Sequence, residues 1–522
     1  MIEYAYSMHT SSLSSGMVVA VPNPNPAETT SIQAAIEEAL LMAERNGITG
    51  AKLTPYVLSK VETLTSGKSL EANIALVLNN ARVAANIAVE LSASTVVHNL
   101  DPLSIRACSS VDKMFPDIQV NRRRKNDVIV IGGGVVDNIA SSTRRCVMHS
   151  SNPGTLMTTV GGVGRNLATG IARLSTAARE YVRGLEERGD IEEGRHVGVC
   201  FLSAIGNDEA GAMVMRDLSE SGVDISRMKV IDRATATYTA IHEREGGGGD
   251  LVAAVADMEI FEFIDADYID IHATCIGEAK LVVVDGNISS GAFLRLAHIC
   301  HQTGTYLFFE PTSDHKCTLP VSIFLSDSIN GIQAVDIMKP NLSELLVITK
   351  SIVLNNEFPL SRIMEGRRDS IIKLIEACSS EENEVEIEKV REVACFLYQA
   401  MHSPSMVGST VNEKHLFVSL GARGCLWVNS NLHLQRTHKY SFQQHDENIS
   451  SMIFLPTFIE PASVINTSGA GDCFLSAIAH RVISTISTGC AKSLHVNDIE
   501  YALQMSSQSL QSPLPVPRKF VL

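Results

Sequence analysis

The sequence predicts an α/β fold whose central sheet begins near residue 127, after a helix-rich N-terminal segment. Two observations support this prediction. From Asp127 onward, short apolar stretches alternate with stretches of helical periodicity, which is the pattern of a sheet between helices. Most apolar stretches end in a polar or glycine-containing turn, and ligands of open α/β sheets bind outside the carboxyl ends of the strands. We therefore expect functional residues to gather in those turns.

The strands expected in this sheet are short apolar runs, namely Asp127–Gly134, His196–Leu202, Leu281–Asp285, Tyr306–Glu310, Ala334–Met338 and His415–Leu420. Thr235–Ile241 alternates in polarity, is followed by the glycines Gly246–Gly249, and the pattern resumes at Leu251. That pattern predicts a β-hairpin with a glycine-rich tip. Residues from about 350 to 412 are helical in pattern and charged, and we expect them to form a surface insertion between two strands.

Helical periodicity dominates the N-terminal segment. Ser31 is the expected N-cap of an amphipathic helix over Ile32–Ala43, which Gly47 closes. A second run covers Thr54–Leu64 and begins near a proline, as helices often do. A third run, Leu70–Leu91, is apolar on most sides, so we expect it to be buried.

These patterns divide the chain into a helical segment over residues 1–98, a linker over 99–126 and an α/β region over 127–522. The linker ends in the basic run Asn121–Asn126. We interpret this run as a solvated linker, with a nuclear-localisation signal as the alternative.

Composition excludes several classes of protein. A length of 522 residues favours more than one domain, and 45% hydrophobic with 19% charged residues indicates a folded chain. A net charge of -15 disfavours binding to nucleic acid. No apolar run is long enough to span a bilayer, and the N-terminus lacks signal-peptide features. The eleven cysteines form no C-x-x-C pair, so we expect reduced thiols and a cytoplasmic protein without a membrane partner.

The run Asn466–Asp472, Asn-Thr-Ser-Gly-Ala-Gly-Asp, carries the strongest chemical signal. The N–H groups of Gly469, Ala470 and Gly471 lie at an expected helix start, where they are unpaired and the helix dipole favours an anion. The run therefore predicts an anion hole for a transferring phosphoryl group. Asp472 is the predicted base that accepts a proton from the attacking hydroxyl. The alternative is a helix N-terminus whose acid serves only as a cap.

A second glycine-rich turn also enters an expected helix. Gly161 and Gly162 would let backbone amides meet a polyol, and Asn166 could bond its hydroxyls. Asp137 follows the first strand, where its carboxylate could hold vicinal hydroxyls. A plain turn between strand and helix is the alternative, and no Gly-x-Gly-x-x-Gly fingerprint is present.

Two further turns are candidates for the nucleotide side of a site. Asn341 and Glu344 are three residues apart on one face of an expected helix start and could order magnesium-bound water, although a capping box would look the same. In Ser419–Gly424 a strand is followed by Gly421 and Gly424, in a turn suited to passing under phosphates. A simple hairpin turn is the alternative.

Together these motifs resemble the ribokinase-like (pfkB) family of sugar and nucleoside kinases over residues from about 127 to 511. The family's Gly-Gly-x-x-Arg-Asn motif is present as Gly161–Asn166, its Asn-x-x-Glu motif as Asn341–Glu344, and its late Gly-Ala-Gly-Asp motif within Asn466–Asp472, in the family's order. The resemblance implies a three-layer sandwich with a central, mostly parallel sheet. It also implies a small β-lid built from segments near 197–201 and 235–241.

The resemblance also implies roles for individual residues. ATP would be the phosphoryl donor, Mg²⁺ the cofactor and Asp472 the base. The implied ligands are Asp137, Gly161, Gly162 and Asn166 for the substrate, Asn341 and Glu344 for the metal, and Gly421, Gly424 and Thr467 for the nucleotide. A monovalent cation is a further implied cofactor, but Asn466 stands where the family usually has Asp, which weakens that expectation.

The N-terminal segment has a separate resemblance. Val18–Pro24, Gly47–Gly50, Leu53–Tyr56, Ser69–Asn73 and Leu76–Ala81 resemble the C-terminal part of pseudouridine-5′-phosphate glycosidase. The segment has no counterpart of that family's catalytic lysine or acidic metal ligands. Asn79 and Asn80 would fall at the edge of its active site.

A kinase joined to such a glycosidase resembles fused proteins that degrade pseudouridine. The leading hypothesis is therefore an ATP-dependent kinase for the 5′-hydroxyl of a nucleoside, with pseudouridine as the expected substrate. One alternative is a bifunctional protein that keeps glycosidase activity, and another is a non-catalytic protein that binds a nucleoside or a partner chain. The sequence leaves a homo-oligomer open.

Overall fold

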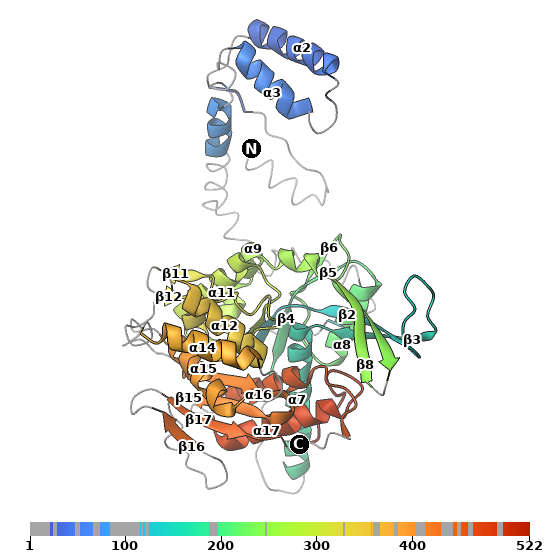
Figure 1. The fold of residues 1–522 in the computed structure, drawn as a ribbon, viewed down its shortest axis with the longest axis vertical. Helices are drawn as coiled ribbons and strands as arrows, with labels where there is room; N and C mark the ends of the chain where they lie inside the picture. The colour runs from blue at the N-terminus through green and yellow to red at the C-terminus, as the bar shows by residue number, and fades with distance from the viewer. Residues whose placement is uncertain are drawn as a thin grey trace. The chain divides into compact units, whose positions relative to one another are not determined.

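The computed structural model describes residues 21–24, 29–46, 48, 53–65, 72, 74–83, 115, 118–120, 125–186, 197–245, 248–326, 329–356, 358, 366–380, 385–402, 413–429, 442–445, 450–457, 463–487 and 494–522. The chain divides into two compact units, Met1–Arg106 (unit 1) and Ala107–Leu522 (unit 2). Both are drawn in Figure 1 and are described separately. Most of the expected linker lies outside the described residues.

Unit 1 is helical where it is described. Helices α2 (Thr29–Arg45) and α3 (Leu53–Leu64) pack around a small core of Ala35, Ala39 and Val61, and residues 74–83 are also helical. The helix expected at Thr54–Leu64 is confirmed. Because α2 begins before Ser31, the prediction that Ser31 caps it is wrong. Gly47 and both ends of the expected third helix lie outside the described residues.

The third helix of unit 1 is not buried as expected. Ile74, Val77 and Leu78 are 51%, 58% and 62% exposed, and Leu58 on α3 is 62% exposed. A large part of the apolar surface of this helix is therefore exposed.

The described central sheet of unit 2 has nine strands in the order β16-β17-β15-β14-β13-β10-β9-β1-β4. Their bounds are β1 Val128–Ile131, β4 Val199–Leu202, β9 Leu281–Asp285, β10 Tyr306–Glu310, β13 Ile337–Met338, β14 His415–Ser419, β15 Cys425–Asn429, β16 Phe442–His445 and β17 Ser450–Leu455. Neighbours from β4 to β14 are parallel, and those from β14 to β16 are antiparallel. The prediction of a mostly parallel sheet is confirmed.

Side chains of β1 alternate between two hydrophobic cores. Val128 and Val130 belong to one core, and Ile129 and Ile131 to the other; all four are at most 1% exposed. A sheet buried on both faces needs apolar residues at every position, which explains the uninterrupted apolar run. The three-layer arrangement expected from the resemblance follows from these two cores.

Different helices supply the two cores. The core that contains Val128 includes residues of α7 (Val163–Glu186), α8 (Glu209–Glu220), α16 (Ala470–Ser487) and α17 (Val496–Leu510). The other core includes residues of α9 (Ala266–Ile271), α10 (Ala273–Glu278), α11 (Ser290–Thr303), α12 (Leu342–Leu354), α14 (Arg368–Ser380) and α15 (Ile387–Ala400). No described helix is long and apolar enough to cross a membrane.

Two sequence predictions for the part of this unit outside the lid need correction. The expected surface insertion over 350–412 contains α15, whose Val390, Phe396 and Tyr398 are fully buried, so α15 is a core helix with charges on its outer face. The strand expected at Ala334–Met338 is confined to β13. Ahead of it in the sequence lies the 3₁₀ helix η3 (Gly331–Ala334), which is stabilised by a capping box.

Smaller elements complete unit 2. They are β5 (Ala204–Gly206) with β6 (Lys229–Ile231), β11 (Phe324–Ser326) with β12 (Ile329–Asn330), and the 3₁₀ helices η2 (Glu259–Phe263) and η5 (Gly421–Arg423).

A separate four-stranded sheet forms the lid. Its order is β3-β2-β7-β8, with β2 Val135–Ser142, β3 Gly154–Gly161, β7 Thr237–Glu245 and β8 Gly248–Asp257. The predicted hairpin is confirmed as β7 and β8. The placement of residues 197–201 in the lid is wrong, because β4 pairs with β1 in the central sheet. An apolar run alone does not identify the sheet it joins.

Candidate active site

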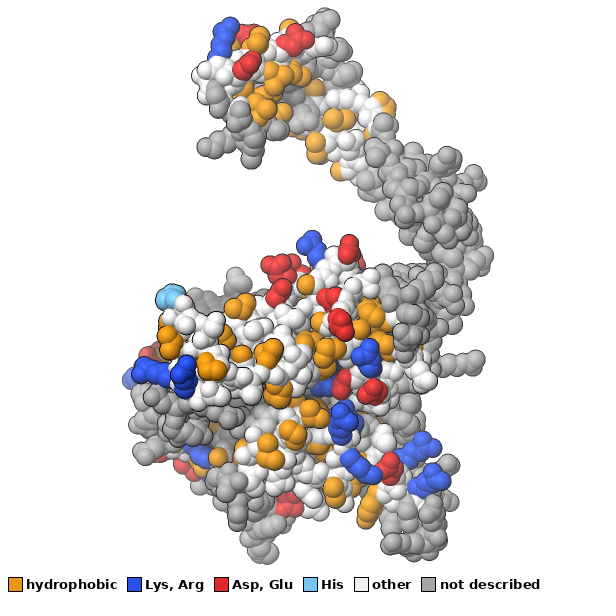
Figure 2. Space-filling model, turned by 90° about the vertical axis from the view of Figure 1, so that its right-hand side faces the viewer, with side chains coloured by type: hydrophobic (Ala, Val, Ile, Leu, Met, Phe, Trp, Pro, Cys, Tyr) orange, Lys and Arg blue, Asp and Glu red, His pale blue; other side chains and the backbone are white. Residues whose placement is uncertain are grey.

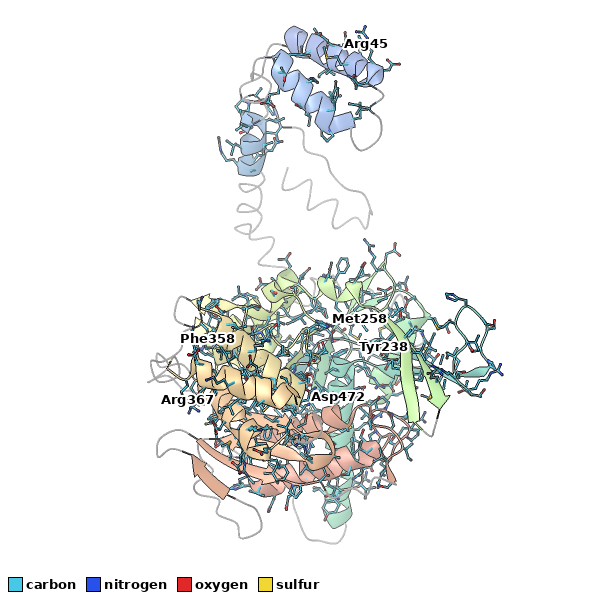
Figure 3. All side chains as sticks on the ribbon, viewed as in Figure 1. Arg45, Tyr238, Met258, Phe358, Arg367 and Asp472 are labelled. Atoms are coloured by element: carbon cyan, nitrogen blue, oxygen red, sulfur yellow. The ribbon has the colours of Figure 1, made fainter. Side chains whose placement is uncertain are left out.

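The carboxyl ends of the parallel strands gather most of the candidate residues. The turn Gly132–Gly134 follows β1, Asp285 ends β9, Glu310 ends β10 and Lys339 follows β13. In Figure 3, Asp472 is labelled near the middle of unit 2, and Tyr238 and Met258 are labelled toward the lid. The edge of the sheet predicted to carry the chemistry therefore does carry polar side chains.

Asp472 lies in the first turn of α16, at the predicted helix start. The Asn166 Nδ2 donates a hydrogen bond of 2.8 Å to the Asp472 Oδ2. This contact joins the two glycine-rich motifs, which are 306 residues apart in the sequence. Burial raises the pKa of Asp472, although the Asn166 hydrogen bond and the charges of Lys339 and Arg165 lower it. A raised pKa makes the carboxylate a better proton acceptor.

The turn before α16 is the one predicted to form the anion hole. Gly469 has φ of 79°, and a Cβ there would lie 2.2 Å from the Pro515 carbonyl oxygen. Glycine is therefore required both by the backbone conformation and by the close approach of the C-terminal segment. The first amides of a helix have no acceptor in the preceding turn, which leaves the N–H groups of Gly469, Ala470 and Gly471 available to an anion.

Lys339 lies close to Gly471, at the start of α16. A Cβ on Gly471 would lie 3.1 Å from the Lys339 Nζ, and that nitrogen is 3.4 Å from the Glu310 Oε2. Burial lowers the pKa of Lys339, but the carboxylates of Glu310, Glu344 and Asp472 outweigh it and raise the value. Burial also raises the pKa of Glu310 to about 8. Lys339 therefore stays charged and places a buried positive charge next to Asp472 and the anion hole.

Asp137 and the second glycine motif meet in the lid. Strands β2 and β3 pair Asp137 with Thr159, so Asp137 and Gly161 share one face, and a Cβ on Gly161 would lie 1.9 Å from the Asp137 Oδ2. Gly161 is therefore needed to make room for the carboxylate. Burial raises the pKa of Asp137 to about 6, although the charge of Arg165 lowers it.

Asp285, which sequence reasoning did not select, holds the neighbouring turns together. Its carboxylate accepts hydrogen bonds from the N–H groups of Gly133 at 2.9 Å, Gly164 at 2.8 Å and Asn287 at 2.7 Å. It therefore fixes the turn after β1 against the start of α7. The sequence signal that could have identified Asp285 is its position at the carboxyl end of the predicted strand Leu281–Asp285. Arg165, Glu310 and Lys339 were also not selected.

Asn341 and Glu344 form a capping box, which the sequence analysis gave as the alternative to a metal-binding pair. The Glu344 carboxylate accepts from the Asn341 N–H at 2.9 Å, and the Asn341 Oδ1 accepts from the Glu344 N–H at 2.9 Å. Among the described residues, no group of three or more His, Cys, Asp and Glu could enclose a metal. One carboxylate is the usual protein contribution to a Mg²⁺ held by nucleotide phosphates, so Glu344 remains the predicted metal residue.

The turn Ser419–Gly424 joins the antiparallel strands β14 and β15 as a hairpin, which is the simpler of the two interpretations given for it from the sequence. Gly421 and Gly424 have φ of 57° and 118°, and a Cβ on Gly424 would lie 2.1 Å from the Leu455 carbonyl oxygen. Ser419 also bridges to Asn341, so this turn lies beside the start of α12. Thr467 is exposed in the turn before the anion hole.

Asn466 does not fit a monovalent-cation site. Its Oδ1 accepts from the Ser468 N–H at 3.0 Å, which turns its Nδ2 toward the Pro513 carbonyl oxygen at 3.4 Å. The amide oxygen of Asn466 is therefore already engaged within the turn, and it carries no charge to attract a cation. The structure therefore gives no support to the expected monovalent cation at this turn.

Over residues 125–356, the chain matches the profile of the pfkB family carbohydrate kinases. This part of the chain is therefore similar to the pfkB family. The pfkB region contains Asp137, Gly161–Asn166 and Asn341–Glu344, and the Asn166 hydrogen bond links it to Asp472 further along the chain. The enzyme class expected from the sequence, a phosphotransferase acting on an alcohol group, is that of the family. Residues 2–90 match the profile of Indigoidine synthase A like protein.

Curated relatives match both parts of the chain. A pseudouridine-metabolizing bifunctional protein of Schizosaccharomyces pombe is 24% identical over 493 residues, covering 88% of this chain and 59% of that protein. Pseudouridine kinase of Escherichia coli is 30% identical over 223 residues, covering 42% of this chain and 60% of the kinase. Pseudouridine-5′-phosphate glycosidase of Geobacillus kaustophilus is 54% identical over 82 residues, covering 15% of this chain and 27% of the enzyme.

The chain thus spans less than two thirds of the length of these relatives. Among solved structures, ribokinase from Giardia lamblia aligns with a TM-score of 0.49 at 16% identity, covering 76% of this chain and 98% of that chain.

Proposed function

We propose that unit 2 transfers the γ-phosphoryl group of ATP to the 5′-hydroxyl of a nucleoside, with pseudouridine as the preferred acceptor. The observation that carries the proposal is the hydrogen bond from Asn166 to Asp472, because it unites the two motifs expected on either side of the reacting hydroxyl. The match of residues 125–356 to the profile of a carbohydrate kinase family supports the reaction class.

In this reaction Asp472 accepts the proton of the substrate hydroxyl. The hydroxyl oxygen forms a bond to the γ-phosphorus as the bond from that phosphorus to the bridging oxygen of ADP breaks. The amides of Gly469, Ala470 and Gly471 donate to the transferring group, and the Lys339 ammonium close to Gly471 adds positive charge. Glu344 and Asn341 would hold Mg²⁺, which neutralises charge on the ATP phosphates.

On the substrate side, Asp137 accepts hydrogen bonds from vicinal hydroxyls of the sugar, and Gly161 and Gly162 let the backbone approach it. The nucleotide lies over Gly421, Gly424 and Thr467, on the side of the hairpin beside Asn341. The preference for pseudouridine rests on the names of the curated relatives, which match both the kinase region and the N-terminal segment.

The test measures ADP release by the full chain with pseudouridine, uridine, adenosine, ribose and fructose 6-phosphate. We expect turnover to be fastest with pseudouridine, and Asp472→Asn to lower kcat by about 10²-fold or more, the usual contribution of a general base. Asp369→Asn is the matched control, since Asp369 is an exposed acid in the first turn of another helix. Turnover with a different substrate alone would refute the substrate assignment. Unchanged turnover in Asp472→Asn would refute the mechanism.

A further inference from the structure

Arg165 links the proposed base to an acid outside the site. It lies in the first turn of α7 and is 4% exposed. One guanidinium nitrogen donates to the Asn166 Oδ1 at 2.8 Å, and the other terminal nitrogen pairs with Asp217 on α8. Since Asn166 in turn donates to Asp472, a continuous chain of hydrogen bonds runs from Asp217 to the proposed base.

This chain determines which way the Asn166 side chain points. A carboxamide can be turned over so that its oxygen and nitrogen exchange places, and only its partners decide between the two arrangements. Arg165 has donors only, so it must face the carboxamide oxygen. The NH₂ group is then directed at the Asp472 carboxylate, whereas the reverse arrangement would set an oxygen against that carboxylate.

Asp217 holds the far end of the chain. It pairs with Arg165 and, at 3.5 Å, with Arg173, and its side chain is 25% exposed. It lines a cavity of about 460 Å³ between the lid strand β3, helices α7 and α8, and residues 514–519. Asp217 can therefore be substituted without changing any residue of the proposed anion hole or of the proposed nucleotide side.

We propose that Arg165 is a positioning residue, which Asp217 anchors and which orients Asn166 so that its amide holds the Asp472 carboxylate toward the substrate hydroxyl. The proposal rests on the function proposed above, because it assumes that Asp472 is the base. It assigns to Asn166 a task on the base in addition to any contact with substrate hydroxyls. The side-chain partners of Arg165 in the structure are Asn166 and Asp217.

The electrostatics give this role a measurable signature. The charge of Arg165 lowers the pKa of Asp472 and that of Asp137, in each case against the raising effect of burial. Loss of that charge and of the ordered amide therefore moves the titration of the base to higher pH. A purely structural arginine would lower the melting temperature without moving this titration.

The experiment records kcat against pH, the KM for ATP and the melting temperature for full-chain Arg165→Met, Arg165→Lys and Asp217→Asn. For Arg165→Met we expect the acid limb of the kcat–pH profile to lie about one pH unit higher than in the wild type. At a given pH on that limb, kcat is then about tenfold lower. The KM for ATP should stay within about twofold, because Arg165 lies outside the proposed nucleotide side. The pH profile of Arg165→Lys should lie closer to that of the wild type. Combining Asp217→Asn with Arg165→Met should cause no further shift of the profile.

Arg391→Met is the matched control for stability. Arg391 is also 4% exposed and pairs with Glu388 at 2.6 Å, but it lies on α15 away from these contacts. If both arginine variants lose stability and neither moves the pH profile, Arg165 is only structural and the inference is overturned. If Asp472→Asn retains full turnover, the proposed function fails instead. Should Arg165→Met not fold, an unshifted profile in both Arg165→Lys and Asp217→Asn overturns the inference.

Discussion

The two units of this chain differ in how much of their sequence is used to make a core. In unit 1 the buried apolar side chains of the described helices are Ala35, Ala39, Ala43 and Val61, while leucines such as Leu41 and Leu58 are more than half exposed. In unit 2 every residue of β1 is buried, and helices cover both faces of the sheet. An amphipathic helix gains most of its stability from the surface it packs against, so the same helical propensity gives unequal stability in the two units.

The units also differ in their polar interiors. Unit 2 keeps several charged groups at most 5% exposed, among them Asp285, Glu310 and Lys339, each held by partners from other elements. Such groups are costly to bury and persist only where a deep core fixes their partners. In the proposed function, phosphoryl transfer therefore belongs to unit 2, and three predictions sharpen the contrast between the units.

The largest expected contrast is in hydrogen exchange. We expect amides of α2 and α3 to exchange on the order of a thousandfold faster than those of β1 and β9, because a small core allows local opening at little cost in free energy. Exchange mass spectrometry on the full chain measures both sets of amides at once. Equal, slow exchange in the two units would show that unit 1 is stabilised by contacts absent from the described residues.

The second prediction concerns the pH dependence of substrate binding. The pKa of Asp137 is raised to about 6, so its carboxylate is charged above that pH and becomes neutral below it. We expect the KM for the nucleoside to rise as pH falls from about 7 to 5, by about tenfold, because charge-assisted hydrogen bonds are lost. The KM for ATP should not follow it. In Asp137→Asn the nucleoside KM should be high and independent of pH, and a flat wild-type profile would contradict the assignment.

The smallest expected effect comes from unit 1. The Asn79 Nδ2 donates to the Pro22 carbonyl oxygen at 3.2 Å, so Asn79→Ala should lower the stability of unit 1 by about 1 kcal/mol and leave kinase turnover unchanged. Asn80→Ala is the control, because Asn80 is exposed. A fall in turnover in Asn79→Ala would show that the two units act together. Release of uracil from pseudouridine 5′-phosphate, lost in Asn80→Ala, would reveal a second activity.

The sequence predicted the strands of unit 2 well because each parallel strand is buried on both faces and is therefore an uninterrupted apolar run. It predicted the glycine motifs because glycine is required there, as Gly161 and Gly469 show by the contacts a Cβ would make. Neither signal says which residues distant in sequence will meet. The roles of Lys339 and Arg165 depend on such meetings, so they could not be read from the sequence.

The errors have a similar origin. The charges of the segment over 350–412 suggested a surface element, but the inward face of α15 supplies Phe396 and Tyr398 to the core. Segment 197–201 was wrongly assigned to the lid, because an apolar strand sequence does not indicate which sheet the strand joins. Local pattern therefore identified element type in both cases and failed on tertiary context.

The close packing of Pro515 against Gly469 has a consequence for the order of events during synthesis. The Pro515 carbonyl oxygen accepts from Ser509 Oγ at 2.8 Å and touches the turn before α16, while Arg173 binds the carbonyl oxygens of Val516 and Pro517. On the ribosome the N-terminal helices emerge first, and domains fold in that order. The turn before α16 cannot gain this packing until residues 515–517 have been made. A nascent chain in which unit 1 has already emerged therefore still lacks the contacts that hold the proposed catalytic turn.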